Sequence, residues 1–199
     1  MFIQVIEGKV SDQGEIDRLM ERWRAEVQPG ATGYLGVTAG TTADGRSIAI
    51  VRFDSAESAA ANAARPEQSA WWSEMEKAYD GPVTFSDSSD IDVNLEPSGD
   101  AGFVQVMKGQ TDQRARIDEL AKTFTARMKE VRPEILGDVA IWFDGGRYIE
   151  VVYFTSEAAA RAGEQAELPE DLAAIYAEFG EILAAGGGEF LDLPNPDIH

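Results

Sequence analysis

The sequence predicts an α+β fold in which one β-α-β-β-α-β unit occurs twice in tandem. A strand motif that returns is the first observation behind this prediction: FIQVIEG at residues 2–8 comes back as FVQVMKG at residues 103–109. The second is a constant shift that carries Ile16 onto Ile117 and continues without a gap up to Ala160. The third is the same order of strand and helix patterns in both copies. A repeat this long exceeds the unit of a solenoid and indicates duplicated domains.

The two predicted units are residues 1–96 and 103–199. Between them lies the short polar segment PSGDAG at 97–102, whose Pro, Ser and Gly residues are typical of a linker.

An amphipathic helix is predicted after each first strand. Apolar residues recur there at the spacing of a helix that buries one face. In the first unit they are Ile16, Leu19, Met20, Trp23 and Val27, and in the second Ile117, Leu120, Ala121, Phe124 and Met128. We expect these side chains to form core.

A hairpin and a second helical region follow in each copy. The turns ADGR and DGGR supply the Asp and Gly that tight hairpins favour. Ser55 and Ser156 are the expected N-caps of the second helical region, which is interrupted at Pro66 or Pro169. Each unit then closes with a last strand, in VTFSDSSDIDVNL and in EFLDL.

This order of elements places both helices on one face of an antiparallel sheet and leaves the other face uncovered. An uncovered apolar face needs a partner layer. We therefore expect the two sheets to pack face to face within the chain, with a possible ligand cavity between them.

Composition restricts the class of protein. The chain has 199 residues, 44% of them hydrophobic, which is ordinary for a globular protein with a core. Its 36 acidic and 17 basic residues give a net charge of −19, which argues against binding to nucleic acid or to anionic membranes. With no cysteine there is no disulfide, thiolate nucleophile or Cys-bound metal. The N-terminus lacks a leader pattern and no apolar run could span a bilayer, so we expect a cytoplasmic protein.

The order of elements, the hairpins leading into VRFDSAESAA and VYFTSEAAAR, and the duplication together resemble the dimeric α/β-barrel superfamily with its ferredoxin-like units. The similarity is to the antibiotic-biosynthesis-monooxygenase-like branch, here with two units fused in one chain. That superfamily includes cofactor-independent monooxygenases, haem-degrading enzymes, isomerases and proteins without a known role. A single chain of this kind is expected to be a monomer with an internal pseudo-dimer, or a homodimer.

The resemblance also suggests site residues. Relatives place a polar amide of the first strand and an aromatic residue at the end of the third strand in their cavity. Gln4 and Gln105 occupy the first of these places, and Phe53 and Phe154 the second. Haem-binding members use a histidine of the second helical region, whereas the single histidine here is His199. No cofactor is therefore expected.

Glu150 is the candidate catalytic residue. Strand alternation places it on one face with Val152 and Phe154. Because a carboxylate beneath helices is costly without a partner, we expect this face to look into the space between the sheets. A general base with a raised pKa is one interpretation, and an ion pair with Arg147 or Arg52, or solvation at the barrel mouth, is the other.

Trp142 and Trp72 complete the predicted ligand-binding set, and Trp72 is equally explained as a partly exposed neighbour of a core tryptophan. The amides of Gln4 and Gln105 are equally explained by hydrogen bonds to each other or to water. The acidic segment DSSDIDVN at 87–94 lacks the glycine and distal glutamate of a calcium loop, so no metal site is predicted.

Two functions fit this pattern. The first is a protein that binds a small apolar or aromatic molecule without turnover. The second is a cofactor-independent monooxygenase or isomerase acting on a phenolic, quinol or polyketide-like substrate, with Glu150 as the base and Gln4, Gln105 and Trp142 orienting the substrate.

Overall fold

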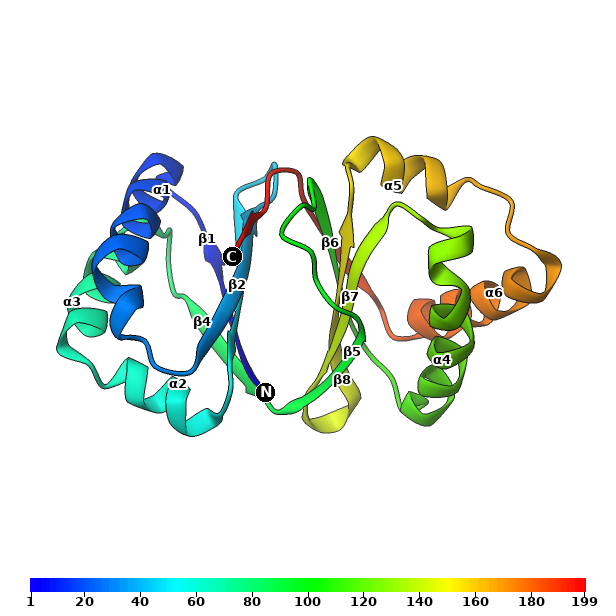
Figure 1. Ribbon diagram of the computed structural model, residues 1–199, viewed down its shortest axis with the longest axis horizontal. Helices are drawn as coiled ribbons and strands as arrows, with labels where there is room; N and C mark the ends of the chain where they lie inside the picture. The colour runs from blue at the N-terminus through cyan, green and yellow to red at the C-terminus, as the bar shows by residue number, and fades with distance from the viewer. The chain divides into compact units, whose positions relative to one another are not determined.

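The computed structural model describes residues 1–199 and divides the chain into two compact units. Unit 1 comprises Met1–Ser89 with Asp197–His199, and unit 2 comprises Asp90–Pro196. Each unit is an antiparallel five-stranded sheet with its helices on one face (Figure 1). The predicted tandem of β-α-β-β-α-β units is confirmed.

Unit 1 has the sheet order β10-β2-β3-β1-β4. Its strands are β1 (Phe2–Lys9), β2 (Tyr34–Thr41), β3 (Arg46–Phe53), β4 (Thr84–Ser88) and β10 (Asp197–Ile198). Its helices are α1 (Gln13–Arg22), which continues as a π-helical turn (Trp23–Val27), α2 (Ala56–Ala63) and α3 (Pro66–Met75).

Unit 2 has the sheet order β5-β7-β8-β6-β9. Its strands are β5 (Asp90–Leu95), β6 (Phe103–Gln110), β7 (Ile135–Trp142), β8 (Arg147–Phe154) and β9 (Glu189–Leu193). Its helices are α4 (Arg114–Val131), α5 (Glu157–Glu164) and α6 (Glu170–Ala185).

The edge strands depart from the sequence prediction. The segment expected to be one last strand of the first unit is two strands, because β4 runs out of partner: Ser88 pairs with Ile3, close to the start of β1. The chain then forms β5 on β7 of unit 2, where Asp90 pairs with Trp142. Asp197 likewise pairs with Ala39 of β2. The division between units therefore falls at residues 89/90 and 196/197, whereas the sequence places it in the linker 97–102.

Local sequence explains why the helices begin where they do. The side chains of Ser55 and Ser156 accept hydrogen bonds from the backbone N–H of Ser58 (3.1 Å) and Ala159 (3.2 Å), as predicted for N-caps. The predicted apolar stripes supply core residues: Leu19, Trp23 and Val27 in unit 1, and Leu120, Phe124 and Met128 in unit 2.

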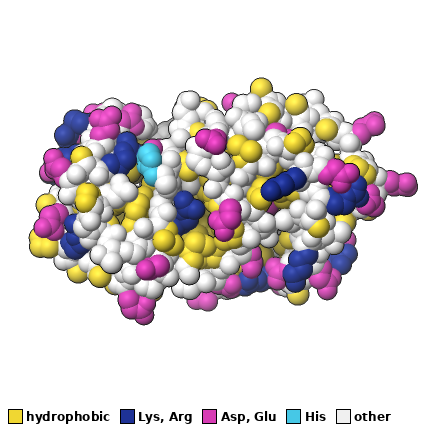
Figure 2. Space-filling view, in the orientation of Figure 1, with side chains coloured by type: hydrophobic (Ala, Val, Ile, Leu, Met, Phe, Trp, Pro, Cys, Tyr) yellow, Lys and Arg dark blue, Asp and Glu magenta, His cyan; other side chains and the backbone are white.

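On the face seen in Figure 2, acidic side chains are interspersed with Lys and Arg and do not form one patch. Arg116, for example, pairs with Glu178 (2.6 Å) and Glu119 (2.9 Å) on exposed helix surface. No helix combines the length and the apolar character that crossing a membrane requires.

Candidate functional site

Glu150 lies on the helix-covered face of unit 2. Its strand neighbours on that face, Val152 and Phe154, belong to the core cluster that contains Phe124 of α4 and Leu172 of α6. The prediction that this face looks away from the helices is wrong. Desolvation of a carboxylate is still costly there, but a pocket beside the side chain and a raised pKa reduce the cost.

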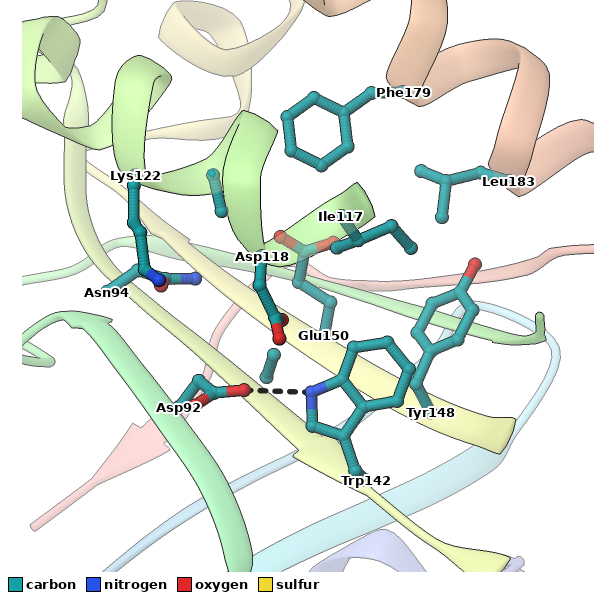
Figure 3. Close-up of a pocket in the computed structure, with 12 residues that line it drawn as sticks. Asp92, Asn94, Ile117, Asp118, Lys122, Trp142, Tyr148, Glu150, Phe179 and Leu183 are labelled. Carbon is teal, nitrogen blue, oxygen red and sulfur yellow. Dashed lines mark hydrogen bonds between the residues drawn. The ribbon is translucent and has the colours of Figure 1, made fainter. Parts of the chain in front are cut away.

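The pocket lies between the sheet of unit 2 and the helices α4 and α6, with a volume of about 150 Å³ (Figure 3). Strands β5, β7 and β8 form its floor, because their paired residues present side chains to the same face. The lining residues are Asp92, Asn94, Ile117, Asp118, Ala121, Lys122, Ala140, Trp142, Tyr148, Glu150, Phe179 and Leu183. Two of the predicted site residues, Glu150 and Trp142, therefore meet in one pocket.

Trp142 is held by three neighbours. Its indole N–H donates to the Asp92 carboxylate over 2.9 Å, and its ring centroid lies 5.5 Å from that of Tyr148. The Arg114 guanidinium carbon lies 4.7 Å from the ring centroid, within cation–π range. The indole is thus fixed as a wall of the pocket.

Arg114 neutralises the acidic side of the pocket. From the first turn of α4 it forms ion pairs with Asp90 and with Asp92 (3.3 Å), and its Nε lies 4.0 Å from Asp118. These pairs lower the pKa of Asp90, chiefly through the hydrogen bond from Arg114. The Asp90 carboxylate therefore stays ionised near neutral pH.

Glu150 has no such partner. No hydrogen bond or ion pair reaches its carboxyl group, and neither Arg147 nor Arg52 pairs with it. Desolvation, reinforced by the nearby Asp138 carboxyl, raises the pKa of Glu150 to about 8. Near neutral pH this side chain is mainly a protonated carboxylic acid.

Asp138 and Tyr148 respond to the same environment. Asp138 of β7 is buried and accepts a hydrogen bond from the Asn94 amide over 3.3 Å. Desolvation raises the pKa of Asp138 to about 6 despite that bond. Burial and the Glu150 charge raise the pKa of Tyr148 to about 12, so its hydroxyl stays protonated.

The two repeated glutamines form hydrogen bonds within their own units. The Gln4 amide donates to Asp87 over 3.1 Å, and the Gln105 amide donates to Asp192 over 3.0 Å. Each amide therefore ties the first strand of its unit to the neighbouring edge strand. Neither lines the pocket of unit 2.

The predicted aromatic residues Phe53, Phe154 and Trp72 also lie outside that pocket. Phe53 packs edge-on against Tyr34, with ring centroids 5.9 Å apart, and Phe154 packs against Phe103 at the same distance. Trp72 of α3 contacts Phe85 at 5.2 Å. Each of these three side chains packs against an aromatic neighbour within its own unit.

Several residues in or beside the pocket are not among the site residues predicted from the sequence. Tyr148 stands two positions before Glu150 on the same strand face, a signal that alternation could have supplied. Asp118 and Lys122 are four residues apart beside the apolar stripe of α4, so they lie on one helix face. Asp138 carries no local signal, because its position opposite Val152 depends on strand register.

No group of three or more His, Cys, Asp or Glu side chains is arranged to hold a metal ion. In the acidic segment 87–94, Asp87 accepts from Gln4, and Asp90 and Asp92 pair with Arg114.

Comparison with known proteins shows the fold. No family model matches the sequence, and no curated protein matches it. A putative monooxygenase from Fusobacterium nucleatum is similar in structure, with a TM-score of 0.76 at 10% identity over 100% of this chain and 93% of that one. A putative monooxygenase from Lactobacillus acidophilus gives 0.72 at 10% identity, over 100% and 98%. A ferredoxin fold protein from Listeria monocytogenes, related to antibiotic biosynthesis monooxygenases, gives 0.55 at 8%, over 99% and 96%.

These likenesses extend over both units and confirm the predicted fold, a ferredoxin-like unit repeated within one chain. At identities of 10% and below they concern the fold alone.

Proposed function

We propose that unit 2 binds a small aromatic molecule in the pocket beneath α4 and α6, with Glu150 as its polar contact. One observation carries this proposal: a carboxyl group without a protein partner lines a pocket whose walls include Trp142, Tyr148 and Phe179. Buried polar groups in proteins are nearly always hydrogen-bonded, so a group left open beside a pocket indicates a missing partner. Apolar pockets with a few polar groups are the usual form of a ligand site.

The size of the pocket limits the ligand. A cavity of about 150 Å³ is large enough to hold one benzene ring. Sites for drug-sized ligands have volumes of about 300–1,000 Å³, at least twice that of this pocket. The proposal is therefore for one aromatic ring with a small polar substituent.

Binding is better supported than turnover. The donors expected to stabilise a substrate anion already have acceptors in the protein: Gln105 donates to Asp192, Gln4 to Asp87 and the Trp142 N–H to Asp92. Stabilisation of a developing anion requires donors that are free to face it.

A second candidate function rests on the raised pKa of Glu150. A carboxylate with a pKa of about 8 is a stronger base than an ordinary one, and therefore closer to a phenol in proton affinity. In a cofactor-independent monooxygenase or isomerase, this carboxylate would take the phenolic proton, leaving a phenolate and a neutral carboxylic acid. The fold shared with putative monooxygenases makes this chemistry worth testing.

Calorimetric titration with toluene and phenol tests the binding proposal. We expect phenol to bind more tightly than toluene by about tenfold, the worth of one buried hydrogen bond. The Glu150→Leu variant should still bind toluene but lose the preference for phenol. Glu181→Gln, on an exposed position of α6, is the control and should bind as the parent protein does. Absence of binding by both compounds would refute the proposal.

Oxygen consumption with hydroquinone tests the second function. If Glu150 is the base, the rate should rise as pH increases from 6 to 9, because the carboxylate forms over that range. The Glu150→Gln variant should lose this pH-dependent rate, whereas Glu181→Gln should keep it. Consumption that is unchanged by Glu150→Gln would exclude the role of base.

A further inference from the structure

We propose that the polar group of the ligand is a cation, and that the pocket of unit 2 recognises an aryl amidinium or aryl ammonium ion. This inference rests on the proposed binding function and specifies its ligand class. It follows from the charge of the pocket, from its aromatic walls and from the open position beside Glu150.

The charge around the pocket is predominantly negative. Three lining residues, Asp92, Asp118 and Glu150, carry carboxyl groups, and the only lining residue with a basic side chain is Lys122. Lys122 is exposed on α4, and the side chains of Asp92 and Asp118 are partly exposed, so water screens all three charges. The single positive charge of Arg114 is shared among three carboxylates, those of Asp90, Asp92 and Asp118. Once Glu150 is ionised, four carboxylates face the two basic groups of Arg114 and Lys122, so an anionic ligand would meet net repulsion and a cation net attraction.

Glu150 is the position at which a cation would be paired. Asp92 already accepts from Trp142 and Arg114, whereas the Glu150 carboxyl has neither a hydrogen bond nor an ion pair. In Figure 3 it points from β8 toward the helices, beside Ile117 and Asp118. A planar amidinium presents two parallel N–H groups, which match the two oxygens of a carboxylate.

The aromatic walls favour a cation as well. Trp142, Tyr148 and Phe179 line the same pocket, and aromatic faces attract cations that have been removed from water. Trp142 already shows this property within the protein, since the Arg114 guanidinium carbon lies 4.7 Å from its ring centroid.

Binding of a cation must be linked to proton release. Glu150 is protonated in the unliganded protein below about pH 8 and has to ionise to pair with the ligand. The groups that face it are Asp92 of β5, Asp138 of β7, Tyr148 of β8, and Asp118 and Lys122 of α4; α6 contributes only Phe179 and Leu183. Of these, Asp138 also titrates below pH 8. The affinity should therefore rise up to about tenfold for each pH unit between about 6 and 8.

Three compounds of nearly equal shape provide the test: benzamidine, benzamide and benzoate, titrated by calorimetry at pH 6.0 and pH 8.5. We expect benzamidine to bind at least about tenfold more tightly than benzamide at pH 8.5, with a smaller difference at pH 6.0. Benzoate should not bind at pH 8.5, where Glu150 is ionised. Repeating the titrations in buffers of different ionisation enthalpy should show proton release on benzamidine binding below pH 8.

Substitutions distinguish the contribution of Glu150 to binding from that of the surrounding charges. Glu150→Gln should abolish the preference for benzamidine and leave benzamide binding in place, and Asp118→Asn should weaken benzamidine only a few-fold. Glu181→Gln removes the same charge from exposed α6 and should change neither. The inference is overturned if benzamide or benzoate binds as tightly as benzamidine, or if the preference survives Glu150→Gln. If the preference for a cation is refuted but phenol and toluene bind, the proposed binding of a small aromatic molecule still stands. If none of the five compounds binds, both the proposed function and the inferred ligand class are refuted.

Discussion

The two units have one fold and differ in what occupies the space above the first strand. In unit 1, Tyr79 follows α3 and its ring lies against Gly8. A Cβ atom added to Gly8 would come within 2.6 Å of the Tyr79 ring. Its hydroxyl bonds Ser47, the residue paired with Gly8 across β1 and β3. In unit 2, the tyrosine that lies on Gly109 is Tyr148, from the strand β8 itself.

This difference places Tyr148 in the wall of the pocket of unit 2. Tyr148 occupies the sheet position that Ser47 has in unit 1, so no side chain from after the last helix is required to cover the glycine. The corresponding segment of unit 2 is the glycine run at 186–188. The glycine that closes both strand motifs is thus explained by packing, since in each unit a tyrosine needs the space of a missing side chain.

Removal of the tyrosine in unit 1 should have the largest effect predicted for that unit. Tyr79→Ala deletes a large side chain and its hydrogen bond to Ser47. We expect a loss of about 3 kcal/mol in the free energy of unfolding of unit 1. Hydrogen exchange of peptides from β1 and β3 would measure it, with β6 and β8 as the internal control. Equal loss of protection in both units would contradict the assignment of Tyr79 to unit 1 alone.

The second prediction concerns Glu150, whose counterpart in unit 1 is Ala49. The pKa of Glu150 is raised on folding from an ordinary value near 4.5 to about 8, so the folded state holds its proton more tightly than the unfolded state. The resulting stability is complete below about pH 4.5 and is lost as pH rises to about 8. The loss is on the order of 4 kcal/mol and affects unit 2.

Glu150→Gln should remove most of this pH dependence and make unit 2 more stable than the parent protein at pH 9. Hydrogen exchange of β8 peptides at pH values between 5 and 9, corrected for the intrinsic exchange rate, measures the change. The same measurement on β3 provides a control that should not respond. A variant that is less stable than the parent at pH 9 would show that Glu150 is paired when ionised, and would also weaken the proposed ligand site.

The sequence predicted the fold well because its signals are periodic and occur twice. The stripes of α1 and α4 and the caps Ser55 and Ser156 depend only on neighbouring residues, and the structure contains them as expected. The last strands are harder to predict from the sequence, because β5 pairs with β7 and β10 pairs with β2. Each of these partners lies far away in the sequence. Whether the two sheets pack face to face stays a prediction.

The candidate site was predicted only in part. Strand alternation correctly placed Glu150 with Val152 and Phe154, but alternation does not say which face the helices cover. A charged Glu150 would avoid the face beneath the helices, whereas its raised pKa lets it lie there as a neutral acid. Asp138 was missed for a related reason, since its effect on Glu150 depends on the register of β7 and β8.

The smallest predicted effect concerns the repeated glutamines, whose hydrogen bonds differ in exposure between the two units. Gln105 is partly buried, and its acceptor Asp192 also binds Arg161, whereas Gln4 bonds the exposed Asp87. Gln105→Ala should cost about 1 kcal/mol in unit 2, and Gln4→Ala less than about 0.5 kcal/mol in unit 1, because water replaces the lost partner of an exposed carboxylate. Urea unfolding followed by hydrogen exchange of β9 and β4 peptides measures both. If Gln4→Ala proved the costlier change, the amide would have to contribute to unit 1 through something other than its bond to Asp87.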